Sequence, residues 1–503
     1  MAFNRISFAA ILASLMFVLA WTVLNWSCAP ARAEPRPVIA STGTDTAPGR
    51  DDDKELLERG KELFTREWIV GDRRSHAGDG LGPVYNAQSC AACHRLGGIG
   101  GAGNNETNVS LVTVFVSEKF TGFAISGVLP QHPLPPGDAR TKIVRDASGR
   151  EFELAMPSQD ELAKIHPILR TQPSFPFHRF GVGPEFAQWK VSIFPKDETK
   201  TERFNKQGSN RRHCEVTDSG MLTLIESKRN TPPLFGAGLI NAIPDNVLEA
   251  VAADQAKASA GASSAFRRGD EVLPVRGRVA RLKDGRAGRF GWKATVANLR
   301  EFTLQACSSE LGLEVPGFAR AAPPWKSDYK APGIDLTSAQ CDTLTRFVAS
   351  LPGPGVRLAD STEEFGEIER GRELFASVGC AVCHRPNLGI VEGIYSDLLL
   401  HNMGHELSDS GSYTVLEPQI AAKDKARQPR AANELEWRTP PLWGLRDSAP
   451  YLHDGRAATV ADAVALHGGE GRSAAQEYKR LSEKEREQVE LFLNTLTAPA
   501  MAP

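Results

Sequence analysis

Cys380-Ala381-Val382-Cys383-His384 is the stretch that decides how this 503-residue chain is interpreted. Two cysteines separated by two residues, with histidine directly after them, form the attachment pattern of c-type haem. The cysteines can form thioethers to one porphyrin, and the adjacent imidazole is then the proximal ligand of the iron. The same pattern recurs at Cys90-Ala91-Ala92-Cys93-His94. The sequence therefore predicts two covalent haems, with His94 and His384 as iron ligands.

A CxxC pair can also be a redox dithiol or half of a zinc site. A thioredoxin-like dithiol needs a βαβ context, which is not evident around either pair. A zinc site of four thiolates would have to join two pairs from widely separated segments. Two copies that each carry the following histidine, in an exported chain, favour haem.

The N-terminus has the pattern of an export signal. Arg5 provides the positive charge, Ile6 to Trp26 is nearly all apolar, and Ala31-Arg32-Ala33 is an A-x-A cleavage site. We expect a signal peptide over 1–33 and a disordered polar linker over 34–50. The apolar run is long enough to cross a bilayer, so an uncleaved anchor is the alternative. Either way, the body of the chain is expected outside the cytoplasm, in the periplasm.

Composition is that of an ordinary globular protein, with 41% hydrophobic and 24% charged residues and a formal net charge of -2. Nothing in it suggests a nucleic-acid partner. Of the eight cysteines, four belong to the haem motifs and Cys28 lies in the leader. This leaves Cys214, Cys307 and Cys341, and we expect Cys307 to pair with Cys341 because both fall late in the same domain.

Three sequence blocks occur twice in the same order, which indicates an internal duplication. The first is Glu58-Arg59-Gly60-Lys61-Glu62-Leu63-Phe64, which returns at 369–375 just before the second CxxCH. The second is a Thr-Pro-Pro-Leu block at 231–234 and 439–442. The third begins at Leu336 and at Leu481, where Thr or Ser acts as the N-cap of an amphipathic closing helix.

The duplication predicts a mainly α protein with two cytochrome c-like domains in tandem. We place the domains at 51–351 and 362–497, with a linker at 352–361 and a short tail at 498–503. Each first helix is expected to pack against the closing helix of its domain. The first domain is enlarged by loop and β-strand insertions, and the alternating run Ser110 to Ser117 is typical of a strand.

The two halves differ on the side that approaches the second face of each haem. After its Thr-Pro-Pro-Leu block the second half contains His453-Asp454-Gly455 and then His467, whereas the corresponding 239–245 segment of the first half has no histidine. We therefore predict His467 as sixth ligand of the second haem. A six-coordinate haem suits electron transfer, and an open face can bind peroxide or dioxygen.

Other ligands stay open at both irons. For the second haem, Met403 comes after His467, followed by His401 and His405; His453 fits better as a hydrogen-bond partner of a propionate or a backbone carbonyl. For the first haem, the insertions offer His178, His213 and Met156. Peroxide cleavage also needs a group that moves a proton between the two oxygens. The candidates for that group are Glu185, Glu226 and Glu249.

Several motifs of the chain resemble those of the di-haem oxidoreductase family, also labelled thiol oxidoreductases. This family is related to the bacterial di-haem cytochrome c peroxidases and to the di-haem maturation enzyme of methylamine dehydrogenase. The residues that carry the resemblance are Gly80 to Pro83 with Asn86, Ser89-Cys90, Arg229 to Ile243, Arg289 to Ala294, Ser396 to Gly404 and Thr439 to His467.

The resemblance implies catalysis at the N-terminal haem and electron entry or storage at the C-terminal one. In the peroxidase relatives the ligand of the C-terminal haem stands at the spacing that His467 occupies here. The relatives also place a tryptophan between the haems, for which Trp292 and Trp443 are the candidates, and they hold an interdomain calcium. Calcium is therefore a further cofactor to consider, although no acidic cluster of the chain demands it.

The sequence thus predicts a periplasmic, peroxidase-like di-haem oxidoreductase, with a small redox protein or cytochrome as electron donor and a peroxide-type oxidant. An electron-transfer protein with two six-coordinate haems is one alternative. Oxidation of an organic or protein substrate through the iron is another. A thiol reaction would rest on Cys214, Cys307 and Cys341 and on the family label alone.

Overall fold

The computed structural model describes residues 50–499 except 118–125, 129–139, 146–150, 157–158, 171, 173, 195–200, 207–208, 216–221, 262–264, 268–269, 327, 410 and 412–430. The predicted signal peptide and the predicted linker up to residue 49 lie outside the described residues. Within the described residues, none of the helices has the length and apolar character needed to cross a bilayer.

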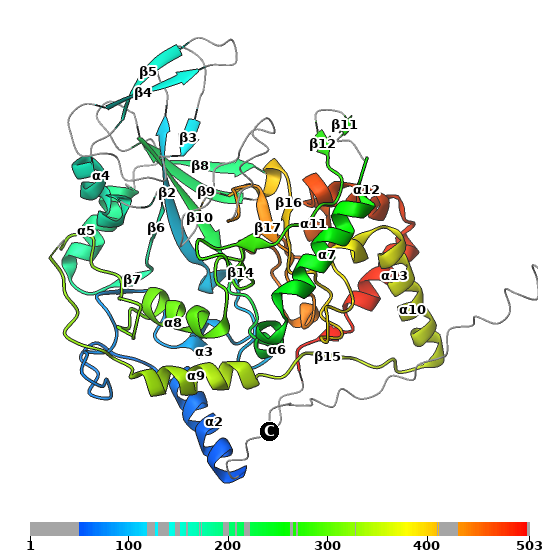
Figure 1. Ribbon diagram of the computed structural model, residues 1–503, viewed down its shortest axis with the longest axis horizontal. Helices are drawn as coiled ribbons and strands as arrows, with labels where there is room; N and C mark the ends of the chain where they lie inside the picture. The colour runs from blue at the N-terminus through cyan, green and yellow to red at the C-terminus, as the bar shows by residue number, and fades with distance from the viewer. Residues whose placement is uncertain are drawn as a thin grey trace, which may run out of the picture. The chain divides into compact units, whose positions relative to one another are not determined.

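Helices dominate both halves of the chain (Figure 1). Their bounds are α2 (Arg50–Thr65), α3 (Cys90–Cys93), α4 (Gln159–Ile165), α5 (Pro184–Ile193), α6 (Ala237–Ala242), α7 (Asp245–Ala258), α8 (Leu299–Glu310), α9 (Ser338–Ser350), α10 (Thr362–Ser377), α11 (Val460–Ala465), α12 (Arg472–Arg480) and α13 (Glu483–Leu493).

The first half closes by packing α9 against α2, as predicted (Figure 1). The helices touch at Gly60, where a Cβ would lie 2.5 Å from Phe347 Cβ and 2.6 Å from the carbonyl oxygen of Thr343. One turn further along α2, the rings of Phe64 and Phe347 have centroids 5.4 Å apart. Glycine therefore stands in the repeated block because the closing helix lies directly over it.

The second half repeats this arrangement with α10 and α13. A Cβ at Gly371 would lie 1.9 Å from the carbonyl oxygen of Gln488, and the rings of Phe375 and Phe492 have centroids 5.6 Å apart. Gly60 and Gly371 hold the same position of the repeated block, so the sequence repeat corresponds to a repeated helix contact.

Both closing helices begin with the predicted caps. The Thr337 side chain accepts a hydrogen bond from the Gln340 N–H, and the Gln340 side chain in turn accepts one from the Thr337 N–H. Ser482 and Glu485 form the same reciprocal capping box at the start of α13. These caps satisfy N–H groups that have no partner inside the helix.

The insertion between the first CxxCH and the first Thr-Pro-Pro-Leu block forms the largest sheet. Its strands run in the order β3-β2-β10-β9-β8, with β6 also paired to β2, and every pairing is antiparallel. Their bounds are β2 (Val109–Ser117), β3 (Ser126–Val128), β6 (Ser174–Pro176), β8 (Thr201–Lys206), β9 (Ser209–Glu215) and β10 (Leu222–Arg229). The predicted strand at Ser110 to Ser117 is therefore correct.

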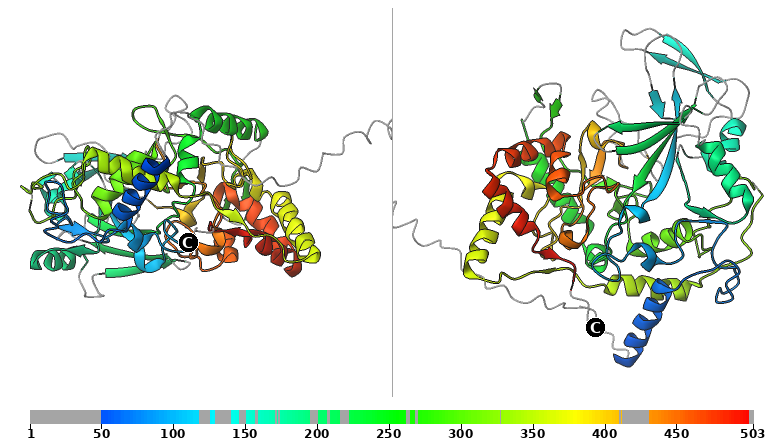
Figure 2. Two further views of the ribbon diagram at one scale, coloured as in Figure 1. Left: turned by 90° about the horizontal axis from the view of Figure 1, so that it is seen from below. Right: turned by 180° about the vertical axis from the view of Figure 1, so that it is seen from behind.

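The sheet has a core of its own beside α4 and α5 (Figures 1 and 2). Phe175 and Trp189 lie at its centre, with ring centroids 6.2 Å apart, and the indole N–H of Trp189 donates to the Ile165 carbonyl.

Short two-stranded pairs make up the remaining β structure. They are β1 (Val84–Tyr85) with β7 (Phe180–Gly181), β4 (Arg140–Arg145) with β5 (Glu151–Met156), β11 (Ala265–Arg267) with β12 (Asp270–Val272), β13 (Ala280–Arg281) with β14 (Ala287–Gly288), β15 (Gly355–Val356) with β18 (Leu496–Thr497), and β16 (Leu400–Asn402) with β17 (Glu436–Arg438).

The core of the first half continues into the second half. Leu388, Leu399 and Trp443 of the second half pack in the same buried cluster as residues of α2, α8 and α9. The backbones of Arg278 and Leu400 also exchange hydrogen bonds of 3.0 and 2.9 Å. The insertion after α7 is therefore built into the second half rather than lying on its surface.

Cys307 and Cys341 are both free, so the predicted disulfide is wrong. Cys307 lies in α8 and Cys341 in α9, and both side chains are buried in the core of the first half. Their role in this structure is apolar packing, which is common for a buried free cysteine. The side chain of Cys214 lies outside the described residues.

Candidate haem sites

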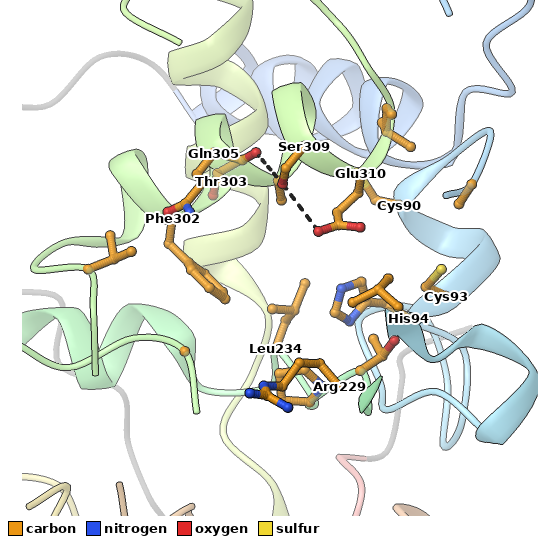
Figure 3. A pocket seen from close by; sticks show the side chains of 18 of the residues that line it. Cys90, Cys93, His94, Arg229, Leu234, Phe302, Thr303, Gln305, Ser309 and Glu310 are labelled. Atoms are coloured by element: carbon orange, nitrogen blue, oxygen red, sulfur yellow. Dashed lines mark hydrogen bonds between the residues drawn. The ribbon is translucent and has the colours of Figure 1, made fainter. Parts of the chain in front are cut away.

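The first CxxCH forms one short helix, α3, at the edge of a cavity. The Ser89 side chain caps this helix by accepting from the Ala92 N–H at 3.1 Å. The His94 N–H donates to the Cys90 carbonyl at 3.0 Å, which extends the turn to the histidine. Cys90, Cys93 and His94 thereby face the same space (Figure 3).

The orientation of His94 is fixed by the segment that follows it. Nδ1 lies 3.1 Å from the carbonyl oxygen of Gly101, to which it donates in the corresponding tautomer. The Thr-Pro-Pro-Leu block supports this segment, because the Gly103 N–H donates to the Thr231 carbonyl at 3.0 Å and the Leu234 N–H to the Gly100 carbonyl at 2.7 Å. Burial lowers the pKa of His94 to about 4, so the ring is neutral. The lone pair of its Nε2 could then bind a metal.

The cavity beside His94 holds about 1310 Å³ of empty space, part of it open solvent. Much of its lining is apolar, as a haem pocket requires; these residues include Phe64, Ala87, Val109, Leu111, Leu234, Val296, Phe302, Leu311, Leu344 and Val348. The two cysteines, the histidine and the apolar walls therefore fit a covalently attached haem.

Glu310 is a polar group at the end of α8 that lines this cavity (Figure 3). Its Oε2 accepts from Asn86 Nδ2 at 2.6 Å, and its Oε1 accepts from the Ser309 hydroxyl at 3.2 Å. Asn86 is itself buried and accepts from the Arg179 N–H at 3.0 Å. The carboxylate is thus held in place beside His94, and Gln305, five residues earlier on the same helix, also lines the cavity.

Two basic side chains, Arg229 and Lys293, also line the cavity, together with Trp292. Arg229 forms a buried ion pair with Asp409 at 2.9 Å. Lys293 donates to the carbonyls of Asn433, Glu434 and Glu436 at 3.0, 3.1 and 2.7 Å. Burial lowers the pKa of Lys293 well below its usual value. Charged carboxylates entering the cavity, such as porphyrin propionates, would meet these two side chains.

The four cysteines of the two motifs are poor thiolates. Burial raises the pKa of Cys90 and of Cys380 to about 12, and of Cys93 to about 11. A reactive redox dithiol needs a thiolate, so these environments disfavour that interpretation. All four are also free of disulfides.

The second CxxCH has a matching geometry. Cys380–Val382 form a 3-10 turn, η3, and His384 Nδ1 lies 3.0 Å from the carbonyl oxygen of Tyr395. The ring centroids of Phe375 and His384 are 6.4 Å apart, against 6.3 Å for Phe64 and His94 in the first half. Each motif histidine therefore lies beside the phenylalanine of the repeated block.

The charge of His467 acts on His384, whereas no histidine in the described part of the chain acts in this way on His94. His467 follows α11 and its Nδ1 lies 2.8 Å from the carbonyl oxygen of Ala463, which leaves Nε2 as the nitrogen that could bind iron. The pKa of His384 is lowered to about 4 by burial and then by charge on His467. The shift at His94 is caused by burial, moderated by the carbonyls of Gly101 and Pro232.

The structure separates the proposed acid groups of the first haem. Glu185 and Glu249 are exposed, and Glu249 pairs with Arg281. Glu226 is buried in β10, but it does not line the cavity beside His94. None of the three acids that were predicted from the sequence is therefore placed to act there.

The alternative ligands of the first haem are not in the cavity lining either, where the structure describes them. His178 is buried and its Nε2 lies 3.1 Å from the Ser309 carbonyl oxygen, behind α8 rather than in the cavity lining. The side chains of His213 and Met156 lie outside the described residues.

The alternative ligands of the second haem have different surroundings. His401 is buried between two carboxylates, and His405 is exposed. Met403 lies next to His467: a Cβ at Gly471 would be 3.0 Å from Met403 Cε and 3.2 Å from His467 Cδ2. His453 stacks on Trp437, with ring centroids 3.7 Å apart.

Of the two candidate tryptophans, Trp292 lines the cavity and Trp443 does not. The indole N–H of Trp292 donates to the Asn230 carbonyl at 2.9 Å, and its own carbonyl accepts from the Arg438 N–H at 3.0 Å. Trp292 is therefore at the wall between the first cavity and the second half. Trp443 packs in the buried core.

In the described part of the chain, one group of side chains has the spacing of a metal site: Cys383, Asp397 and His401. Both ring nitrogens of His401 lie within hydrogen-bond distance of carboxylates, and Cys383 belongs to the haem motif. We therefore assign no separate metal to it. Calcium stays a prediction from the resemblance.

Sequence reasoning missed Glu310 and Gln305. The signal that could have found them is helix α8 itself, which follows the Arg289 to Ala294 motif and begins at the N-cap Asn298. Its cavity-lining side ends in Gln305, Ser309 and Glu310. Residues four apart lie on one helix face, which marks this end as a polar patch.

Curated relatives match part of the chain. It is 30% identical over 198 residues to the methylamine utilization protein MauG of Methylorubrum extorquens, covering 37% of this chain and 51% of MauG. It is 25% identical over 207 residues to the cytochrome-c peroxidase IdrP2 of Pseudomonas sp. strain SCT, covering 37% of this chain and 54% of that protein. The chain thus spans about half the length of the curated relatives that it matches.

A solved structure of a MauG-like protein associated with microbial copper homeostasis is also similar, with 16% identity, 51% of this chain and 90% of that chain covered, and a TM-score of 0.26. A TM-score of this size does not establish a common fold. The family model described as "Di-haem oxidoreductase, putative peroxidase" matches residues 186–496. This match spans more than half of the sequence and includes the second CxxCH and His467, and the chain therefore belongs to the di-haem oxidoreductase family.

Proposed function

We propose that the chain is a periplasmic, peroxidase-like di-haem c-type oxidoreductase built on two cytochrome c-like domains. In this proposal Cys90, Cys93 and His94 hold the first haem, and Cys380, Cys383 and His384 hold the second. Electrons enter at the second haem from a small redox protein or cytochrome, and a peroxide is reduced at the first. Export through residues 1–33 would bring the chain to the compartment in which c-type haem is attached.

The observation that supports this division of labour most strongly is the difference between the two histidine environments. The charge of His467 acts on His384, which supports an imidazole on each side of the second iron. The lining of the cavity beside His94 has no second histidine among the described residues and contains a held carboxylate instead. A closed iron suits electron transfer, and an accessible iron suits the binding of a small oxidant.

When bound, the first haem supplies the iron that binds and reduces the peroxide. Reduction of a peroxide to water consumes protons as well as electrons, and Glu310 is the group that could move a proton in this cavity. Asn86 and Ser309 hold its two oxygens, so the carboxylate has a fixed direction. Arg229 provides positive charge for the propionates, and Trp292 stands at the wall toward the second half.

Oxidation of an organic or protein substrate is the second candidate. The similarity to MauG and the position of Trp292 favour it, because an aromatic ring at the cavity wall could pass an electron from a substrate that does not enter the cavity. An electron-transfer protein without chemistry of its own would not need the Glu310 carboxylate in the cavity beside His94. Cys307 and Cys341 are buried packing residues, so the structure does not favour a thiol reaction.

Electron paramagnetic resonance of the oxidised protein tests the proposal directly. We expect one high-spin haem and one low-spin haem, and replacement of His467 by Ala should convert the low-spin signal to high spin. Turnover of hydrogen peroxide with a reduced cytochrome should be measured on the same samples. Two low-spin haems, no binding of carbon monoxide at either iron and no peroxide turnover would contradict the proposal.

A further inference from the structure

Three charged side chains form a buried hydrogen-bonded network beside the second CxxCH. They are Asp397, His401 and Glu470, which are 0%, 2% and 8% exposed. His401 Nε2 lies 2.9 Å from Asp397 Oδ2, and its Nδ1 lies 2.7 Å from Glu470 Oε2. Because each ring nitrogen faces a carboxylate oxygen, the geometry calls for a proton on both nitrogens. The imidazolium then joins the two acids.

Glu470 connects this network with the segment that carries His467. It stands three residues after His467, in the 3-10 turn η6 (Gly469–Gly471). Its Oε1 accepts from the Asn402 N–H at 3.0 Å, and its Oε2 accepts from the Arg276 N–H at 2.8 Å. The fit is close, because a Cβ at Gly469 would lie 2.2 Å from the Asn402 carbonyl oxygen.

Asp397, at the other end of this network, is connected to the haem motif through a residue of the first half. Gln255, near the end of α7, donates through Nε2 to Asp397 at 2.8 Å and to the Val382 carbonyl at 3.1 Å. Its Oε1 accepts from the Gly277 N–H at 2.8 Å. Gln255 therefore connects the CxxCH segment with the buried acid, and it comes from α7 of the first half.

Burying such a group of charges is expensive unless every member is satisfied, and breaking it is strongly destabilising. An apolar cluster of the same volume would serve packing alone equally well or better. The network also joins three segments at the proposed second haem site: the attachment turn with Val382, the strand β16 and the His467 turn. This placement suggests that the network orients the three segments relative to one another rather than only filling space.

We propose that Asp397, His401, Glu470 and Gln255 form a positioning network that holds His467 on the second iron. The inference rests on the proposed function, in which His467 is the sixth ligand. Without the network the His467 turn would move, and the second iron would spend part of its time open. The first half of the chain thereby helps to keep the second haem closed.

The test compares variants of the full-length haem protein. The readouts are the low-spin signal of the second haem and the amount of carbon monoxide bound by the reduced protein. Carbon monoxide needs an open position, so the parent protein should bind about one equivalent. Glu470→Ala should raise this toward about two equivalents and reduce the low-spin signal. Glu470→Gln retains an acceptor oxygen of nearly the same shape and should restore most of that signal.

Two further variants make the result decisive. Gln255→Leu has nearly the same volume and removes the contact from the first half, so it should also increase binding of the second equivalent. This variant covers the case in which Glu470→Ala fails to fold. His405→Gln changes an exposed histidine next to the same strand and should leave both readouts at the parent values.

His467→Ala separates the failure of this inference from failure of the proposed function. If His467→Ala leaves both readouts unchanged, His467 is not the ligand, and the proposed function fails at that point. If His467→Ala opens the second iron, while Glu470→Ala and Gln255→Leu both behave like the parent protein, the positioning network is overturned. A low-spin signal that survives Glu470→Ala in a protein with full haem content would also overturn it.

Discussion

Glu310 illustrates what a single side chain can decide in the first cavity. It is bound by Asn86 and Ser309 and stands in the same cavity as His94, whereas Glu185 and Glu249 are exposed on other elements. A proton-transfer group must lie within hydrogen-bond reach of the reacting atoms. Its position in the cavity is therefore what distinguishes Glu310 from Glu185 and Glu249.

Glu310→Gln keeps the shape of the side chain and an oxygen that can accept from Asn86, but it cannot accept or release a proton as the carboxyl group does. We expect peroxide turnover to fall by about 10²–10⁴-fold, the usual contribution of general acid–base catalysis. Carbon monoxide binding and the spin states of both haems should be unchanged. Glu185→Gln is the matched control on the surface. Full turnover in Glu310→Gln would exclude Glu310 from proton transfer.

Buried neutral histidines make stability depend on pH. Burial lowers the pKa of His166 to about 3 and of His453 to about 4, against 6.5 for an exposed histidine. As the pH falls below 6.5, these histidines bind protons in the unfolded chain but stay neutral in the folded chain. Stability is therefore lost until the pH reaches the folded-state pKa. Each such histidine contributes about 1.4 kcal/mol per pH unit in this range.

His166→Phe should therefore weaken the pH dependence. The ring of His166 stacks on Phe175 with centroids 4.5 Å apart, so an aromatic replacement keeps that contact. Urea unfolding at pH 7, 6 and 5 should show a smaller loss of unfolding free energy in the variant than in the parent protein. An identical pH profile for the two proteins would mean that His166 is protonated equally in the folded and unfolded states.

At the scale of the elements, the repeated helix contact depends on its glycines. At Gly371 a Cβ would meet the Gln488 carbonyl oxygen at 1.9 Å, whereas at Gly366 on the same helix it would meet nothing within 4 Å. The two positions therefore separate the effect of close packing from the effect of removing glycine from a helix.

Gly371→Ala should destabilise the second half by about 1–3 kcal/mol or more, because α10 and α13 must move apart. Gly366→Ala should be neutral or stabilising by up to about 1 kcal/mol, as alanine favours the helix. Urea unfolding followed by circular dichroism, together with the haem content of the purified protein, measures both. Equal stability of the two variants would show that the helices can accommodate a methyl group at Gly371.

At the scale of the whole molecule, charges buried between the halves tie them together. Arg229 of the first half pairs with Asp409 of the second at 2.9 Å, and both side chains are buried. Nearby, the Asn230 N–H donates to the His453 carbonyl at 2.7 Å. Removing one member of a buried pair leaves a charge without its partner, which costs more than removing both.

Arg229→Met should lower the unfolding free energy by about 3–5 kcal/mol, and the double variant Arg229→Met with Asp409→Asn should recover part of this loss. Urea unfolding of the single and double variants measures the coupling. Arg300→Met provides a control, since Arg300 pairs with Asp342 at the surface and should change stability by about 1 kcal/mol or less. Additive effects of the two substitutions would show that Arg229 and Asp409 are not energetically coupled.

The predictions that succeeded concern patterns that a short segment carries by itself. The capping boxes at Thr337 and Ser482 depend on residues three apart, and the strand at Ser110 to Ser117 on its own alternation. The packing of α9 on α2 followed from the repeat. The disulfide between Cys307 and Cys341 failed because proximity in the sequence does not fix the directions of side chains on two separate helices.

By itself, the sequence determined the two CxxCH motifs, the duplicated order of helices and blocks, and the absence of a histidine in the first half where the second has His467. These are local, because covalent attachment, capping and helix periodicity depend on residues a few positions apart. Only the tertiary structure decided which acid enters the first cavity and that Gln255 of the first half reaches Asp397 of the second. Such contacts join residues more than a hundred positions apart, and their partners are chosen by packing of the whole chain rather than by any neighbouring residue.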